Sequence, residues 1–292
     1  MNARHSLWRA ASAGALVVGL AACAVAPQAA PELSAQRAAE ILASPDRTPA
    51  DRSNDIRRKP EALLPFIGPR PGMVALDVSA GGGYTTELLA RAIGPTGKVY
   101  GQSQPRDPGR PLPAPAAPEG NSHPSATPSP VLAAPPTAPR PSAVALAERE
   151  QRLRSAQVPA APILAVARRF DDPVPAELAD GRVDLVTLMF NYHDLGHMGV
   201  DRAAMNRALF KALKPGGLYV IGDHAGRPGT GISEAGTLHR VEEAFLRAEV
   251  QAAGFRFLAS ADFLRNPNDP RDKNTPNPPQ PKDEFVLKFV KP

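Results

Sequence analysis

The sequence predicts an α/β fold: a doubly wound, mostly parallel sheet of seven strands with helices on both faces. Strand-like and helix-like segments alternate along most of the chain. Residues 183–190 are apolar on both faces, as a central parallel strand requires. The glycines of residues 81–83 join an apolar strand directly to a helical pattern. Such alternation is typical of parallel sheets covered by helices on both sides.

The expected strands are short and apolar, and they are residues 73–78, 98–101, 163–167, 183–190, 218–221, 255–258 and 285–290. Helices are expected at residues 85–93 and 143–156, with short helical pieces over 35–64. Asp201 can cap another helix, which stops at the Lys-Pro-Gly-Gly sequence of residues 214–217. The last helix ends at Gly254 and carries an apolar stripe of Leu238, Val241, Phe245 and Ala248.

The start of the chain has the pattern of an export signal. Arg4 and Arg9 precede an apolar run at residues 13–22, which is too short to span a bilayer as a mature helix. The run ends in Leu-Ala-Ala-Cys, which resembles the lipobox of bacterial lipoproteins. The resemblance implies cleavage after residue 22 and acylation of Cys23, the only cysteine. We therefore expect a lipoprotein anchored on the periplasmic side of a bacterial membrane.

The composition of the remaining residues indicates a tether, a main domain and an insertion within that domain. Residues 23–60 are expected to form a tether and N-terminal helices, and residues 61–292 the main domain. An insertion at residues 104–142 is dominated by Pro, Ala and Ser, and this composition predicts disorder. Removal of the two signal arginines lowers the net charge from +5 to +3, which gives no argument for nucleic acid as a partner. The oligomeric state is not readable from the sequence.

The glycine cluster is the first functional signal. Gly81, Gly82 and Gly83 follow the first strand of the predicted sheet, and glycines there let the backbone approach a ligand and present its amides. A dinucleotide fingerprint needs a third glycine three positions after Gly83, where the sequence has Thr86. The dinucleotide interpretation therefore fails.

Another family fits these residues better. The sequence LDVSAGGGYTTELLA, followed by LKPGGLYVI, resembles the class I S-adenosylmethionine (SAM) methyltransferases, which have a Rossmann-like sheet. Asp77 matches the acid of their first motif, and Ser79, Gly81 and Gly83 occupy its glycine places. The sequences KVYGQ, NYHDL and DH…GTGISEA…LHR are similar to an exported bacterial subgroup of predicted methyltransferases. The resemblance covers residue 61 to the end, apart from the loops at 105–141 and 266–281.

The resemblance implies SAM as the cofactor and assigns further binding residues. The family has an acid at the end of the second strand to bind the ribose, where this chain has Gln102. A neutral acceptor there weakens binding by about tenfold. Asp171 or Asp172 is expected near the adenine, and Asn191 beside the cofactor. Ser79 is tolerable in place of glycine if its position does not need a positive φ.

The resemblance also places catalytic candidates after the fourth and fifth strands. Tyr192, His193 and Asp194 follow the fourth strand, and Asp223 and His224 follow the fifth. Methyl transfer to a hydroxyl or an acidic amine benefits from a general base. His193 is the first candidate for that base and His224 the second.

A metal is the alternative role for these side chains. His193 and His197 are four residues apart, and His224 and His239 follow. Gly196 disfavours a rigid helical His-x-x-x-His pair, and the helical zinc-protease signature is absent. Asp194 with Asp223 could imitate the magnesium carboxylates of some O-methyltransferases. The sequence therefore predicts no metal.

The predicted function is therefore a SAM-dependent methyltransferase that acts on an unidentified small or envelope-associated acceptor. The alternative is a catalytically inactive lipoprotein that uses the same fold to bind a nucleotide-like ligand. Gln102 favours the alternative, and the cluster of polar residues after the fourth and fifth strands favours the enzyme.

Overall fold

The fold was analysed in a computed structural model of the 292-residue chain, which describes residues 1, 33–105, 140–274, 276 and 280–292. The predicted signal, Cys23 and most of the predicted insertion lie outside these residues. The described residues from 33 onward form one compact unit. Among the described residues, no helix is both long and apolar enough to cross a membrane.

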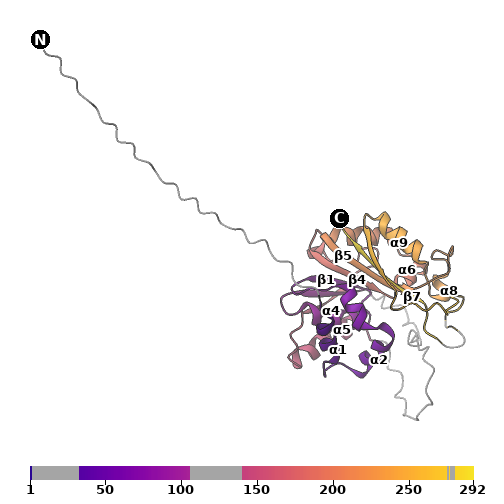
Figure 1. Ribbon diagram of the computed structural model, residues 1–292, viewed down its shortest axis with the longest axis horizontal. Coiled ribbons are helices and arrows are strands. Elements are labelled where there is room, and N and C mark those ends of the chain that lie inside the picture. Colours follow the sequence, from indigo (N-terminus) through magenta and orange to yellow (C-terminus); the bar gives the residue numbers. More distant parts are fainter. Residues whose placement is uncertain (2–32, 106–139, 275, 277–279) are drawn as a thin grey trace. The chain divides into compact units, whose positions relative to one another are not determined.

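The centre of the unit is a seven-stranded sheet in the order β3-β2-β1-β4-β5-β7-β6 (Figure 1). Every neighbouring pair is parallel except those made by β7, which lies antiparallel between β5 and β6. The strands are β1 Val74–Val78, β2 Lys98–Ser103, β3 Ile163–Ala167, β4 Val183–Met189, β5 Leu213–His224, β6 Arg256–Ala261 and β7 Glu284–Val290. The predicted doubly wound, mostly parallel sheet of seven strands is confirmed.

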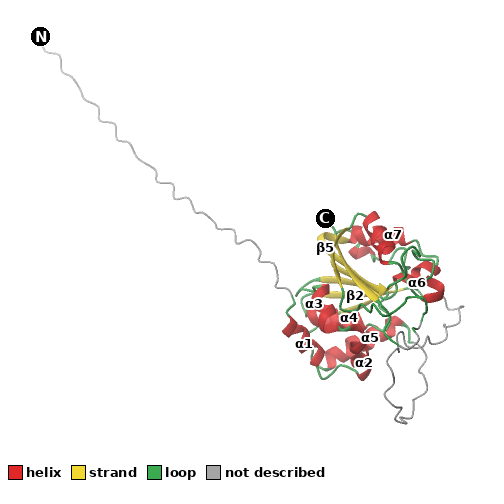
Figure 2. Cartoon of the chain, turned by 45° about the vertical axis from the view of Figure 1, so that its right-hand side comes forward, coloured by secondary structure: helices red, strands yellow, loops and turns green. Residues whose placement is uncertain are grey.

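Helices cover both faces of the sheet, and in Figures 1 and 2 the helices of the first part of the chain lie on the opposite side from the later ones. The earlier helices are α1 Ala35–Ala43, α2 Pro49–Arg58, α3 Pro60–Ile67, α4 Tyr84–Ile93 and α5 Ser142–Ser155. After the 3-10 turn η1 Ala176–Leu178 come α6 Tyr192–His197, α7 Arg202–Ala212, α8 Ala235–Leu238 and α9 Glu243–Ala252.

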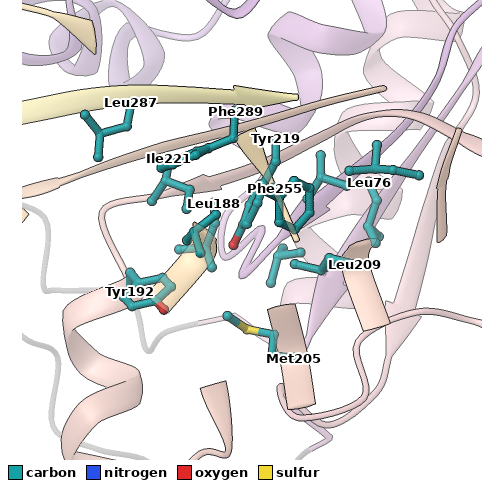
Figure 3. Packing of buried hydrophobic residues seen from close by; sticks show 14 of the residues in the cluster. Leu76, Leu188, Tyr192, Met205, Leu209, Tyr219, Ile221, Phe255, Leu287 and Phe289 are labelled. Carbon is teal, nitrogen blue, oxygen red and sulfur yellow. The ribbon is translucent and has the colours of Figure 1, made fainter. Parts of the chain in front are cut away.

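Two apolar cores follow from the alternation of side chains along the strands. Leu76, Leu188 and Ile221 belong to the core beneath the later helices, where they pack with Met205 and Leu209 of α7 (Figure 3). Strand residues on the opposite face belong to the other core, which packs against α1, α3, α4 and α5. They include Ala75, Leu185 and Val220. The N-terminal helices thus share a core with the main sheet.

One predicted helix is wrong. Leu238, Val241, Phe245 and Ala248 were expected on a single helix, but α8 ends at Leu238 and α9 begins at Glu243. His239 between them has φ 51°, in the left-handed region, and this conformation breaks the helix. Val241 instead forms a bridge with Ala225 just after β5. His239 is therefore a loop residue and not a helical one.

A buried ion network ties α2, α4 and α5 together. Glu87 of α4 is nearly inaccessible and pairs with Arg91, Arg149 and Arg152. Arg149 of α5 also pairs with Asp51 of α2, 2.7 Å away. Burying charges is costly unless all are paired, so the packing of these three helices depends on the carboxylates.

We predict that Glu87→Ala lowers the free energy of unfolding by about 3–5 kcal/mol, because it leaves three guanidinium groups short of a partner. Urea denaturation followed by circular dichroism measures the change. The matched control is Glu40→Ala, which removes the surface pair with Arg37 and should cost at most about 1 kcal/mol. Equal effects of the two substitutions would contradict the importance of the buried network.

Candidate functional site

A cavity of about 300 Å³ lies at the glycine turn that follows β1. The turn supplies Ser79, Gly81 and Gly82, and Asn191 after β4 completes the opposite side. The carboxyl ends of the paired strands β1 and β4 meet here. In open parallel sheets, ligands bind at this edge, where the strand order reverses.

Asp77 anchors the glycine turn from below. It is fully buried near the end of β1, where Thr86 of α4 and Thr187 of β4 donate hydrogen bonds of 2.6 and 2.7 Å to its two carboxylate oxygens. Burial raises the pKa of Asp77 to about 6, although the two threonine hydrogen bonds act in the opposite direction. The carboxylate holds β1, β4 and α4 in fixed relation around the turn.

Ser79 occupies a glycine place of the motif at the cost of backbone strain. Its φ is 59°, so the position does need the left-handed conformation. A non-glycine residue there costs roughly 1–2 kcal/mol. Two hydrogen bonds offset this cost: the Ser79 amide donates to Gln102 Oε1 at 3.0 Å, and Ser79 Oγ donates to Asn191 Oδ1 at 2.7 Å.

Gln102 has an internal role in the structure. It is fully buried, and while its Oε1 accepts from Ser79, its Nε2 donates 2.6 Å to the Arg168 carbonyl. The last residue of β2 is Ser103, one position further along. Both polar atoms of its side chain thus make internal hydrogen bonds, and the buried amide has little access to a ribose. Gln102 holds the glycine turn against the segment that follows β3.

The aspartates after β3 lie apart from this cavity. Asp171 pairs with Arg169, 2.7 Å away, and Asp172 pairs with Arg168. Neither residue lines the cavity at the glycine turn. Both are ion-paired on a polar turn, so the adenine contact predicted for them stays a prediction.

The segment after β4 is strained and strongly hydrogen-bonded. Phe190 has φ 61°, a rare conformation for a bulky residue, and its amide donates to the Gly222 carbonyl of β5 at 2.7 Å. Asn191 Nδ2 donates to Asp194 Oδ2 at 2.8 Å. Strain of this kind occurs at functional sites, where the surrounding structure maintains it.

His193 is buried between two carboxylates. Its Nδ1 lies 2.6 Å from Asp223 Oδ1, and its Nε2 lies 3.3 Å from Asp194 Oδ1. Burial alone would lower the pKa of His193, but Asp223 and Asp194 together raise it to about 10. In this state the ring is protonated at neutral pH, and it is inaccessible to solvent. The geometry does not favour His193 as a general base.

Tyr192 is not brought to the site. Its ring belongs to the apolar core shown in Figure 3, and its hydroxyl group donates to Glu249 of α9 at 2.8 Å. The hydroxyl also accepts a hydrogen bond from Asn206 of α7. The chain places Tyr192 among structural contacts, away from the cavity.

A second cavity, of about 390 Å³, lies at the ends of β5 and β7. His224 forms part of its lining, and His224 Nδ1 lies 2.9 Å from Glu284 Oε1. Burial, and then the positive charge of Lys282, lower the pKa of His224 well below its usual value. His224 is thus neutral at pH 7. The structure favours it over His193 as a proton acceptor.

The two cavities share a wall that the sequence analysis missed. Phe190 lines the first cavity and contacts the His224 ring of the second, with ring centroids 5.7 Å apart. Arg57 and Arg58 of α2 lie over Phe190 at 4.9 and 4.4 Å. Arg149 of α5 donates to the Gly82 carbonyl. No local pattern in the sequence tells where these helices dock, so only the folded chain shows their part in the site.

Comparison with known proteins gives a fold match only. No protein-family model and no curated protein matches the chain. A SAM-dependent methyltransferase from Aquifex aeolicus is 16% identical with a TM-score of 0.51, over 89% of this chain and 99% of that one. Geranyl diphosphate C-methyltransferase from Streptomyces coelicolor A3(2), in complex with Mg²⁺, geranyl diphosphate and S-adenosyl-L-homocysteine, is 12% identical with a TM-score of 0.50, over 87% of each chain. The chain has the class I methyltransferase fold.

We predict that Asp77→Asn stabilises the protein by about 1–3 kcal/mol at pH 7. Because the fold raises the pKa of Asp77 to about 6, the protonated form favours the folded state, and the ionised form at pH 7 costs up to about 3 kcal/mol. The stability of the wild type relative to the variant should therefore rise as the pH falls from 7 through 6 towards 4. Thermal denaturation of both proteins across this range measures the difference. A variant that is less stable at pH 7, or a difference independent of pH, would overturn the assignment.

Proposed function

We propose that the protein is a SAM-dependent methyltransferase whose cofactor binds in the cavity at the glycine turn. One observation carries the proposal. Asp77, Ser79, Gly81, Gly82 and Asn191 line a single cavity where the ends of β1 and β4 meet, within a class I methyltransferase fold. Its volume of about 300 Å³ lies in the range of small-molecule sites.

Methyl transfer places modest demands on the protein. SAM supplies a methyl group that is already activated on a sulfonium, so the chain has mainly to align the acceptor. An acceptor with a neutral nucleophile also needs a proton acceptor. His224 fits this task because its ring is neutral and lines the second cavity. Asp223 contributes by holding His193 and the start of α6 in place.

We assign the second cavity to the acceptor. It is separated from the cofactor cavity by Phe190, which contacts both His224 and the arginines of α2. Glu284 is the one carboxylate in the lining of this cavity, and it pairs with Arg57. The lining also contains three further basic residues: Lys59, Arg265 and Lys282. Such a lining favours an acceptor that carries an acidic or strongly polar group.

Export and lipid anchoring belong to the same proposal. They are supported by the lipobox-like sequence before Cys23 and by the apolar run that precedes it. In this proposal the enzyme acts at the membrane surface on a small or envelope-associated acceptor.

Substitution of a glycine tests the cofactor cavity, and the choice of glycine matters. A Cβ at Gly83 would lie 2.6 Å from Leu146 Cδ2 and 2.9 Å from Arg149 Cδ, so a side chain there disturbs the packing of α5. Gly82 lines the cavity, and a Cβ there has no neighbour within 4 Å. A substitution at Gly82 therefore tests ligand binding without disturbing the fold.

We predict that Gly82→Val weakens SAM binding by roughly 10- to 100-fold, because overpacking a filled site costs about 1–3 kcal/mol. The melting temperature should stay within a few degrees of the wild type. Calorimetry with SAM and with its demethylated product measures both affinities, and Gly82→Ala should give a smaller loss. The proposal fails if the wild type binds neither compound at millimolar concentration, or if Gly82→Val binds both as tightly as the wild type does.

We predict that Cys23→Ser releases the protein from the membrane fraction, because anchoring then lacks its acyl chains. Cell fractionation and mass spectrometry of the mature N-terminus measure the change. An unaltered distribution of the variant, or an intact Met1 in the wild type, would contradict the lipoprotein assignment without affecting the cofactor site.

A further inference from the structure

Three histidine rings surround one carboxylate at the ends of β4 and β5. Asp194 Oδ1 lies 3.0 Å from His239 Nδ1, 3.3 Å from His193 Nε2 and 3.9 Å from His197 Nδ1. The ring centroids of His193 and His239 are 5.5 Å apart and nearly perpendicular. The cluster thus gathers imidazole nitrogens and a carboxylate oxygen from two segments of the chain, α6 and the loop after α8.

Asp223 fixes the orientation of the His193 ring. Asp223 Oδ1 lies 2.6 Å from His193 Nδ1, and this contact holds the ring in place. Nε2 is buried and faces Asp194 Oδ1 at 3.3 Å without a well-formed hydrogen bond, and it must lose its proton to bind a cation. Buried polar atoms normally have partners. A ring that is bonded to a carboxylate through one nitrogen and presents the other is the arrangement typical of metal-binding histidines.

We propose that His193 Nε2, His239 Nδ1 and an Asp194 carboxylate oxygen bind one divalent transition-metal ion, with His197 within reach as a fourth ligand. The three ligand atoms all lie within 4.8 Å of one another. Zn²⁺ with bonds of about 2.0–2.1 Å places tetrahedral ligand atoms about 3.3 Å apart. The distances of 3.0 and 3.3 Å from Asp194 to the two rings already match this separation.

Gly196, which disfavours a helical histidine pair, is what makes this cluster possible. A Cβ at Gly196 would lie 2.6 Å from Ile232 Cγ1 and 3.1 Å from Ala235 Cβ, so only glycine lets α8 pack this closely on α6. The contact brings the loop after α8, with His239, beside Asp194. The second histidine ligand therefore comes from this loop and not from the helix of His193.

The cluster is also accessible. The side chains of His239 and His197 are 40% and 43% exposed, while that of Asp194 is 17% exposed and His193 is buried. An ion can therefore enter from the side of His197 and His239. Imidazole and carboxylate ligands suit Zn²⁺ or Fe²⁺, whereas Mg²⁺ prefers oxygen ligands.

Asn191 connects the proposed metal site to the cofactor cavity by hydrogen bonds. Asn191 donates to Asp194 Oδ2 and accepts from Ser79 Oγ, so the carboxylate that binds the ion also orders the wall of that cavity. The metal site itself rests on the histidine geometry and does not require the proposed methyltransferase activity.

The test is calorimetry of Zn²⁺ binding to the purified full-length chain after chelator treatment, without SAM. We expect one ion per chain, similar binding of Fe²⁺ without oxygen, and at least 100-fold weaker binding of Mg²⁺. His239→Asn should weaken Zn²⁺ binding at least 100-fold. Asparagine tolerates the left-handed backbone of this residue, so the melting temperature of the metal-free variant should match the wild type.

Two further variants make the result specific. Asp223→Asn should weaken Zn²⁺ binding by about 10- to 100-fold, as is usual when the partner of a metal-binding histidine is lost. His123→Asn, a histidine outside the described residues, should leave binding unchanged. The proposal is overturned if the wild type binds no Zn²⁺, if His239→Asn binds it as the wild type does, or if His123→Asn abolishes binding. SAM binding, measured separately, decides the proposed function independently.

Discussion

The buried carboxylate of Asp77 is the constraint on which the site depends. It connects β1 to α4 through Thr86 and to β4 through Thr187, and these contacts set the course of the glycine turn. A charge at this depth is costly, and burial raises the pKa of Asp77 for that reason. Two neutral groups would hold the strands together at lower cost. The acid therefore lowers stability at pH 7, and in the proposed function it contributes to the wall of the cofactor cavity.

A second buried acid, Asp223, organises the neighbouring strand end in a similar way. Its carboxylate accepts hydrogen bonds from the amides of His193 and His224, and it also contacts the His193 ring. Hydrogen bonds from Ser79 through Asn191 to Asp194 then connect the glycine turn with the histidine cluster. The cofactor cavity and the proposed metal site are therefore parts of one polar network along the edge of the sheet.

The sequence predicts what is local and periodic, and it fails where packing through space decides. The strands and the glycine turn follow from apolar patterns and a short motif. The loop position of His239 does not, because its left-handed backbone separates α8 from α9 within the predicted helix. The internal role of Gln102 was equally invisible, since it depends on the strained backbone of Ser79. Docking of α2 and α5 onto the site has no sequence signal either.

The two buried histidines show why spacing alone cannot assign chemistry. His193 and His224 follow neighbouring parallel strands, and their ring centroids are 5.3 Å apart. Yet two carboxylates raise the pKa of His193 against the effect of burial, whereas burial and Lys282 lower that of His224. The first ring is held between two fixed carboxylates, and once Nε2 is deprotonated it would be placed to bind the proposed metal ion. The second stays neutral beside an open cavity, and in that state it can accept a proton from a substrate.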